Sequence, residues 1–363
     1  MTTLIEAPPT DGEGLLPIKK KTSGGGLGRY ILIRFFLIFP TILILVTMVF
    51  FLMRTTGDPI TAALGGRLPP EQLQERITAA GYDRPIFVQY FEYLAQLITG
   101  NFGTTLSDNR PVAEMLATYG AATLELTINA LLVALVVGIP LGLIAAHRRD
   151  KGPDAGLRVF AILCYATPVF FSGLLFKLTF SVWLGWLPVA GRATPANELA
   201  LTALESPTGI YWLDAIRSAN MAALADVIAH SILPALALGL LTAGIFLRLV
   251  RTNVIGTLGK DYVEAGRSRG VSEYRLVTKH AYKPALIPII TVMGLQIAVL
   301  LGGAVLTETT FEWKGLGFQL ATYLTARDFV AVQGIVVLLA VIVAVTNFFV
   351  DILAALIDPR VRY

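Results

Sequence analysis

Ionisable side chains inside long apolar stretches are the first residues of this sequence that could do chemistry. Glu125 and Lys177 each lie within such a stretch. A charged group in an apolar helix is costly to bury, and it usually marks a transport path or pairs with another group. We favour a structural role for both residues, since the ammonium group of Lys177 can extend along its apolar stem to a polar interface.

Amide side chains interrupt the last two apolar stretches of the sequence. They are Gln296, Gln333 and Asn347. Such groups can line a polar path for a transported solute, or they can form hydrogen bonds between neighbouring helices, which contribute about 0.6 kcal/mol each on average. The sequence leaves both interpretations open.

The basic segment from Arg251 to Lys283, here called the basic loop, offers a different kind of site. Its residues 259–270 are polar, suit a helix and end on Gly270. A second short helix is predicted from Ser272, a suitable N-cap, to Tyr282. Two short helices broken at Gly270 would form a rigid elbow that transmits force. The alternative is a solvated basic loop beside anionic lipid, but a segment of about 30 residues with helical order favours the elbow.

Sequence patterns for catalysis, metal binding and nucleotide binding do not occur. The histidines and the single cysteine are spread along the chain as His147, Cys164, His230 and His280. A lone cysteine makes neither a disulfide framework nor a cysteine-based metal site, and Cys164 is interpreted as a packing residue. The patterns His-Glu-x-x-His, Gly-x-Ser-x-Gly and G-x-x-x-x-G-K-[ST] are missing. We therefore predict no catalytic residue, no bound metal and no cofactor, so that any energy from ATP comes from another chain.

The elements that position these residues are predicted to be membrane-spanning helices. The 363 residues are 55% hydrophobic and only 15% charged, with a mean hydropathy of +0.68, whereas soluble proteins carry about 25% charged residues. About 20 apolar residues cross the hydrocarbon layer as a helix, while a membrane β-strand alternates over about ten. Six apolar runs are long enough, and the fold class is therefore all-α with six transmembrane helices: 31–53, 122–147, 157–187, 227–250, 284–307 and 328–357.

Lys and Arg set the orientation of these helices. They concentrate before the first run, after the second, in the basic loop and at the C-terminus, and these regions alternate with segments richer in acids at 54–121, 188–226 and 308–327. Because retained loops carry the excess of Lys and Arg, both termini are predicted to be cytoplasmic. The net charge of +4 then reflects topology and indicates no nucleic-acid partner.

The chain is expected to divide into four parts. Residues 1–28 form a polar, disordered cytoplasmic tail, and 29–53 form the first transmembrane helix, which is too long for a signal peptide. Residues 54–121 form an extracytoplasmic segment, with one helix opening at Pro69-Pro70-Glu71 and another marked by the spacing of Ile86, Tyr90, Leu94 and Leu97. This segment is either a packed cap on the bundle or a docking surface for a partner. Residues 122–363 form a five-helix core, with a coupling loop at about 251–283.

Several motifs resemble the B-type permeases of ATP-binding-cassette importers for dipeptides, oligopeptides and nickel. Glu264-Ala265-Gly266 followed by Gly270 resembles the EAA loop of importer permeases, with Gly266 in place of the second alanine of the family pattern. Lys314 stands where that family usually has proline. The resemblance covers residues 29–363, and it also rests on the stretches 29–34, 57–59, 101–106, 123–127, 280–288, 301–304, 308–311, 315–317 and 358–360.

The resemblance implies the type I importer permease fold and a set of partners. A second, C-type permease would complete the pore, and an extracytoplasmic binding protein would deliver substrate. Two cytoplasmic ATP-binding subunits, which use ATP and Mg, would dock on this chain, itself no enzyme. The docking residues would be Asp261, Glu264, Ala265, Gly266, Arg267, Arg269 and Gly270. The expected location is the lipid bilayer of a bacterial or archaeal plasma (inner) membrane.

The resemblance also implies an external gate before the last apolar run. Glu308, Glu312 and Asp328 border this region, and Gly315-x-Gly317 permits a tight turn. Ordinary acids of a solvated loop are the competing interpretation. The candidate residues of the translocation path or gate are Gln296, Glu308, Phe311, Asp328, Gln333 and Asn347.

Three functional hypotheses follow from the sequence. The leading one is the permease subunit of a di- or oligopeptide importer, forming half of a heterodimeric pore and coupled to ATPases through Glu264–Gly270. The second is a subunit of the same family for nickel or another small solute, against which the missing histidine cluster counts. The third is a self-contained secondary transporter, which would be expected to show internal repeats and buried charges near mid-membrane.

Overall fold

The computed structural model describes residues 27–55 and 57–357. The predicted tail, residues 1–28, therefore lies almost wholly outside the described residues. Helices account for the regular structure of the described part, apart from one isolated bridge between Thr104 and Pro111. The predicted all-α fold class is confirmed.

Five helices are each long and apolar enough to cross a membrane. They begin and end close to the predicted runs, with two exceptions. The helix of the run 122–147 starts ten residues earlier than expected, at Val112, and the helix of the run 227–250 extends past that run at both ends. Their bounds are α1 Leu27–Arg54, α5 Val112–His147, α10 Met221–Leu258, α13 Tyr282–Phe311 and α15 Phe329–Ile357.

The predicted third run is not one continuous span. It consists of α6 (Gly152–Ala166) and α7 (Val169–Phe176), which continues as a π-helix over Lys177–Trp183, and the two parts are bent by 104°. The break falls at Thr167, whose backbone is extended (φ −84°, ψ 127°). Pro168 causes this, because a proline disfavours the helical conformation of the residue before it. Counted as one broken span, the bent pair brings the candidate spans among the described residues to six.

Close packing of α5 against α10 forms the centre of the bundle. An added Cβ at Gly138 would lie 2.7 Å from the carbonyl oxygen of Ala243, and one at Gly239 would lie 2.5 Å from that of Ala130. Only glycine permits this approach of two backbones. Small residues at such contacts let helices in a membrane gain packing and weak polar interactions over a large area.

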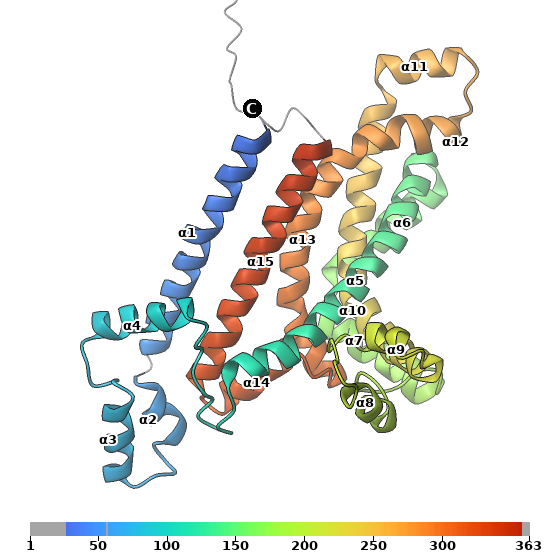
Figure 1. The fold of residues 1–363 in the computed structure, drawn as a ribbon. Coiled ribbons are helices and arrows are strands. Elements are labelled where there is room, and N and C mark those ends of the chain that lie inside the picture. The colour runs from blue at the N-terminus through green and yellow to red at the C-terminus, as the bar shows by residue number, and fades with distance from the viewer. Residues whose placement is uncertain (1–26, 56, 358–363) are drawn as a thin grey trace, which may run out of the picture.

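The two ends of the bundle carry different structures (Figure 1). At one end, called the α11 end, the short helices α11 (Asp261–Ser268) and α12 (Glu273–Arg275) project beyond the spans. At the other, called the α14 end, several short helices gather. They are α2 Pro59–Leu64, α3 Pro70–Ala79, α4 Ile86–Ile98, α8 Pro195–Thr202, α9 Tyr211–Arg217 and α14 Leu316–Thr325.

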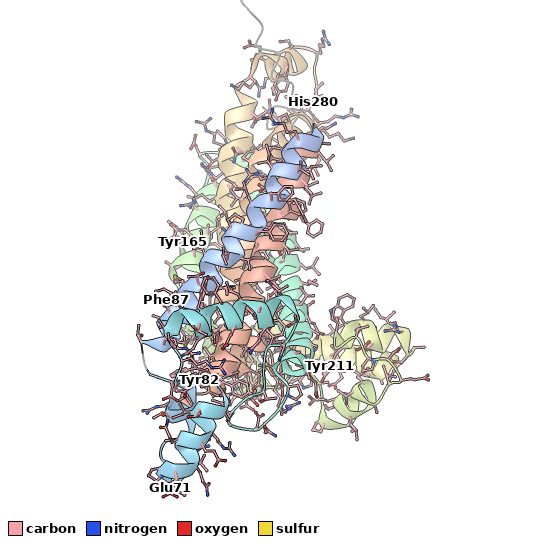
Figure 2. All side chains as sticks on the ribbon, turned by 60° about the vertical axis from the view of Figure 1, so that its left-hand side comes forward. Glu71, Tyr82, Phe87, Tyr165, Tyr211 and His280 are labelled. Atoms are coloured by element: carbon pink, nitrogen blue, oxygen red, sulfur yellow. The ribbon has the colours of Figure 1, made fainter. Side chains whose placement is uncertain are left out.

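The helices predicted at Pro70 and Ile86 are confirmed as α3 and α4. Figure 1 shows α4 lying across the direction of α1, and three of its apolar side chains are largely exposed: Phe87 (67%), Phe91 (66%) and Ile98 (86%). An amphipathic helix with an uncovered apolar face suits a membrane surface. In Figure 2, Glu71 of α3 marks the tip of the α14 end and Tyr211 lies in the unit of α8 and α9 beside the bundle.

Candidate functional site

The basic loop begins within the last turns of α10, continues into α11 and turns sharply at Gly270. Gly270 has a positive φ of 78°, its N–H donates to the Arg267 carbonyl (3.0 Å), and the Val271 N–H donates to the Gly266 carbonyl (3.2 Å). This pair of bonds is a Schellman motif, which requires a left-handed residue and therefore favours glycine. The predicted helix break at Gly270 is confirmed.

The second helix of the elbow differs from the prediction. From Glu273 the chain forms α12, passes through a π-helix over Leu276–Ala281 and enters α13 directly, so no separate helix ends before Pro284. Pro284 is the third residue of α13 and directly follows the π-helical segment. Ser272 occupies the N-cap position, but its side chain makes no capping hydrogen bond. The elbow is therefore continuous with a membrane-spanning helix.

Arg267 links the two arms of the elbow. Its guanidinium contacts Glu264 on α11, and its Nε donates to Glu273 Oε1 on α12 at 2.5 Å. The hydrogen bond from Arg267 lowers the pKa of Glu273 below its ordinary value. Both pairs are partly exposed, so each is worth little energy alone, but together they fix the angle between the arms.

The inner face of the elbow packs on the bundle and the outer face is free. Val263 and Leu276 are fully buried, and an added Cβ at Gly266 would lie 3.1 Å from Leu276. Of the predicted docking residues, Gly266 and Arg267 are half-buried on the inner side. The others are exposed: Asp261, Glu264, Ala265, Arg269 and Gly270. The structure thus places these seven residues on one short, rigid element.

Two further candidate docking residues of the elbow were not identified from the sequence. Tyr262 (50% exposed) and Tyr274 (68% exposed) present large aromatic side chains at the α11 end. Exposed tyrosines beside a rigid charged helix are typical of residues that dominate a protein interface. The signal in the sequence was an aromatic residue within an otherwise polar loop.

A buried ion pair at the same end was also missed. Arg251 Nε and Nη2 donate to the two carboxylate oxygens of Asp154 at 2.6 and 2.7 Å, and Asp154 is fully buried. The pair joins the start of α6 to α10 at Arg251, the first residue of the basic loop. Bidentate geometry makes this contact directional, so it fixes how α6 meets α10 next to the elbow.

The candidate gate acid Glu308 holds the turn that follows α13. It is fully buried, accepts from Thr123 Oγ1 (2.6 Å) and from the Phe318 N–H (2.9 Å), and thereby joins α13, α5 and α14. Thr123 Oγ1 in turn accepts from the Leu316 N–H at 2.7 Å. An added Cβ at Gly317 would lie 2.4 Å from the backbone Cα of Val305, so the glycine is required there.

The other predicted path residues are dispersed. Phe311, fully buried, packs with Leu233 and Ala237 of α10. Asp328, also fully buried, accepts from the N–H groups of Leu106 (2.6 Å) and Ser107 (2.8 Å). Gln296 is buried with Oε1 unpartnered, Gln333 lines a cavity at the α14 end, and Asn347 lines another beside Arg34 and Asp351. Only Glu308 and Phe311 lie close together.

Glu125 and Lys177 both have partners within the chain, as a structural role requires. Glu125, fully buried, contacts Arg192 and also accepts from the N–H groups of Tyr211 (3.3 Å) and Trp212 (3.4 Å). Lys177 Nζ donates to the Thr310 carbonyl at 3.1 Å. Among the described residues no group of three or more His, Cys, Asp or Glu side chains could hold a metal ion.

Replacing Glu308 with glutamine is expected to destabilise the protein by about 1–3 kcal/mol. The amide that replaces one carboxylate oxygen cannot accept, so the Thr123 hydroxyl or the Phe318 N–H loses a buried partner. Glu312→Gln, four residues away and exposed, is the matched control and should change stability by less than about 0.5 kcal/mol. Thermal unfolding of the purified variants measures the difference, and equal midpoints for the two would contradict the assignment.

Comparison with known proteins agrees with this architecture. Residues 138–363 match the family described as binding-protein-dependent transport system inner membrane component, and residues 27–127 match the N-terminal family of such components. The chain therefore belongs to this family. It is a multi-pass inner membrane protein with the type I importer permease fold, and it functions as a permease subunit within a larger transport complex.

Individual relatives match nearly end to end. The chain is 38% identical over 329 residues to the di/tripeptide transport system permease protein DppB of Pseudomonas aeruginosa, covering 90% of this chain and 96% of that protein. It is 34% identical to the dipeptide transport system permease protein DppB of Escherichia coli K12, over 92% of this chain and 99% of that one. The glutathione transport system permease protein GsiC of Salmonella choleraesuis is 33% identical, with the same two coverages.

Proposed function

We propose that this chain forms one half of the membrane pore of an ATP-driven importer of di- or oligopeptides. A C-type permease completes the pore, and two ATP-binding subunits, which hydrolyse MgATP, dock on the basic loop. A separate binding protein delivers peptide at the α14 end. The α11 end and both termini lie in the cytoplasm, in keeping with the excess of Lys and Arg there.

The observation that carries this proposal is the continuity of the elbow with α13. A partner that moves α11 also moves α12, and α12 runs without a break into a membrane-spanning helix. Glu308 and Phe311 lie at the far end of the same helix. Movement at the α11 end is thus transmitted as a rigid-body shift to the candidate gate at the α14 end, which is what alternating access requires.

The names of the relatives support peptides as the substrate class. The three relatives described above are named for dipeptides, di- and tripeptides, and glutathione, which is itself a peptide. All three match over nearly their whole length. This favours peptide transport over the nickel alternative within the same family.

Reconstitution of the complete transporter in liposomes tests the function. We expect uptake of labelled Ala-Ala that requires the binding protein and ATP on the side of the basic loop. Omission of the ATP-binding subunits should reduce uptake to background. Uptake without those subunits would instead indicate a secondary transporter, and uptake of nickel but of no peptide would indicate the second hypothesis.

A further inference from the structure

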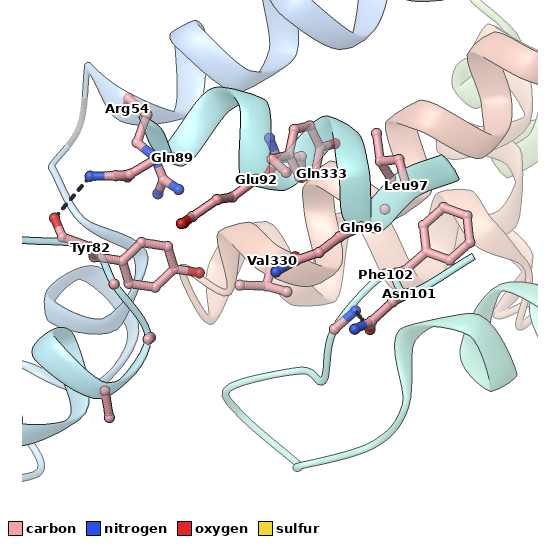
Figure 3. A pocket seen from close by; sticks show the side chains of 16 residues that line it. Arg54, Tyr82, Gln89, Glu92, Gln96, Leu97, Asn101, Phe102, Val330 and Gln333 are labelled. Carbon is pink, nitrogen blue, oxygen red and sulfur yellow. Dashed lines mark hydrogen bonds between the residues drawn. The ribbon is translucent and has the colours of Figure 1, made fainter. Parts of the chain in front are cut away.

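A polar cavity of about 350 Å³ lies at the α14 end, apart from the Glu308 turn. Its walls are α4, the end of α3, the end of α1, the 101–103 segment and the start of α15. Figure 3 shows Gln89, Glu92 and Gln96 extending from α4 on the side of Tyr82. The volume is within the range of small-ligand sites, roughly 300–1,000 Å³.

Unpartnered polar atoms gather around this cavity. In the described part of the chain seven buried side-chain atoms make no hydrogen bond, and three of them belong to its lining: Arg54 Nε, Gln89 Oε1 and Tyr93 Oη. Gln333, only 9% exposed, is a fourth polar side chain of the wall. Buried donors and acceptors normally have hydrogen-bond partners, and each hydrogen bond left unmade costs free energy. Three unpartnered atoms around one cavity indicate a ligand that forms hydrogen bonds with them.

The charges of the wall define that ligand further. The Arg54 guanidinium lies over the rings of Phe50 (5.0 Å) and Tyr82 (4.6 Å), and within the described residues it forms no ion pair. Burial raises the pKa of Tyr93, so its hydroxyl stays protonated and can donate. Arg54 and Tyr93 thus offer donors to an anion, whereas Gln89 Oε1 needs a donor. Glu92, paired with Arg84, adds a negative charge on the same wall.

We propose that this cavity is a second peptide site, which binds a free dipeptide apart from the pore. The terminal carboxylate accepts from Arg54 and Tyr93, the peptide N–H donates to Gln89 Oε1, and the terminal ammonium faces Glu92. Only the choice of a peptide rather than another zwitterion rests on the function proposed above. The site joins α1, α4 and α15, so an occupied site ties the first span to the last.

Equilibrium binding of two probes to the complete transporter in lipid nanodiscs, without the binding protein, tests the site. Ala-Ala should bind saturably, and Arg54→Gln should weaken that binding at least tenfold. Ala-Ala amide, which lacks the carboxylate, should bind more weakly, and Arg54→Gln should change its affinity less than twofold. Arg67→Gln is the matched control, since Arg67 is exposed in the same segment. Equal losses for both probes, or an equal loss in the Arg67 variant, would overturn the proposal.

Tyr93→Phe provides a variant that is expected to fold well. It removes one unpartnered hydroxyl and keeps the ring that stacks on Phe50. Without ligand, the Tyr93→Phe variant should be at least as stable as the parent. Its affinity for Ala-Ala should fall about threefold or more. A purely structural tyrosine would show no change in affinity. If neither the parent nor any variant shows saturable Ala-Ala binding while Ala-Ala uptake persists, the cavity holds water and the second site is overturned. That result would leave the proposed transport function unaffected.

Discussion

Replacing Gly270 with valine is expected to reduce ATP-driven peptide uptake by about fivefold to a hundredfold while the chain remains in the membrane. Gly270 has a φ of 78°, at which a β-branched residue is strained by about 1–3 kcal/mol. Relief of that strain unwinds the Schellman turn, and each 1.4 kcal/mol lowers the population of the docking-competent elbow about tenfold. No atom lies within 4 Å of an added Cβ, so strain rather than collision causes the effect.

Two other variants distinguish backbone strain from side-chain size as the cause of the effect. Gly259→Val places the same side chain at the other end of α11, where φ is −86° and an added Cβ also has no neighbour within 4 Å. It should retain most of the uptake. Gly270→Asn should also retain most of it, because asparagine tolerates the left-handed conformation. Uptake by reconstituted transporter and co-purification of the ATP-binding subunits are the measurements, and normal values for Gly270→Val would contradict the docking role.

The spacing of apolar residues and the positions of proline and glycine predict much of this fold. The helices α3 and α4 follow from a proline pair and from a spacing of three to four residues, and the elbow follows from a polar segment that ends on Gly270. These are local signals, decided by residues within a few turns of each other. Hydropathy placed the five continuous spans for the same reason.

The features that could not be predicted depend on long-range contacts. The 104° bend at Thr167 was hidden because apolar residues continue on both sides of Pro168, and prolines within other runs leave their helices unbroken. Arg192 lies in the connection between Trp183 and Pro195, 67 residues from Glu125, and nothing in either neighbourhood identifies the other. Pairings of this kind are settled by packing, which a single sequence does not show.

The Glu125–Arg192 pair should prove the most sensitive structural contact of the chain. Arg192 is 6% exposed, contacts Glu125, donates to the Gly209 carbonyl at 2.7 Å, and lies 3.6 Å from the centre of the Tyr211 ring. Arg192→Met leaves the buried Glu125 carboxylate without its cation, a change that typically costs about 3–5 kcal/mol. We expect the thermal-unfolding midpoint of the purified chain to fall sharply and uptake to be lost with it.

A second substitution distinguishes an unpaired charge from a lost packing contact. Arg192→Met combined with Glu125→Gln removes the uncompensated charge, so it should recover part of the lost stability, whereas two independent packing defects would add. Arg217→Met is the matched control, because Arg217 is 49% exposed and lies 3.7 Å from buried Asp214, which keeps its hydrogen bonds from Thr208 and Gly209. An arginine at such a half-exposed position contributes about 0–1 kcal/mol. If Arg192→Met unfolds no earlier than Arg217→Met, Glu125 is not held by this pair, and the unit of α8 and α9 is anchored to α5 by its backbone contacts instead.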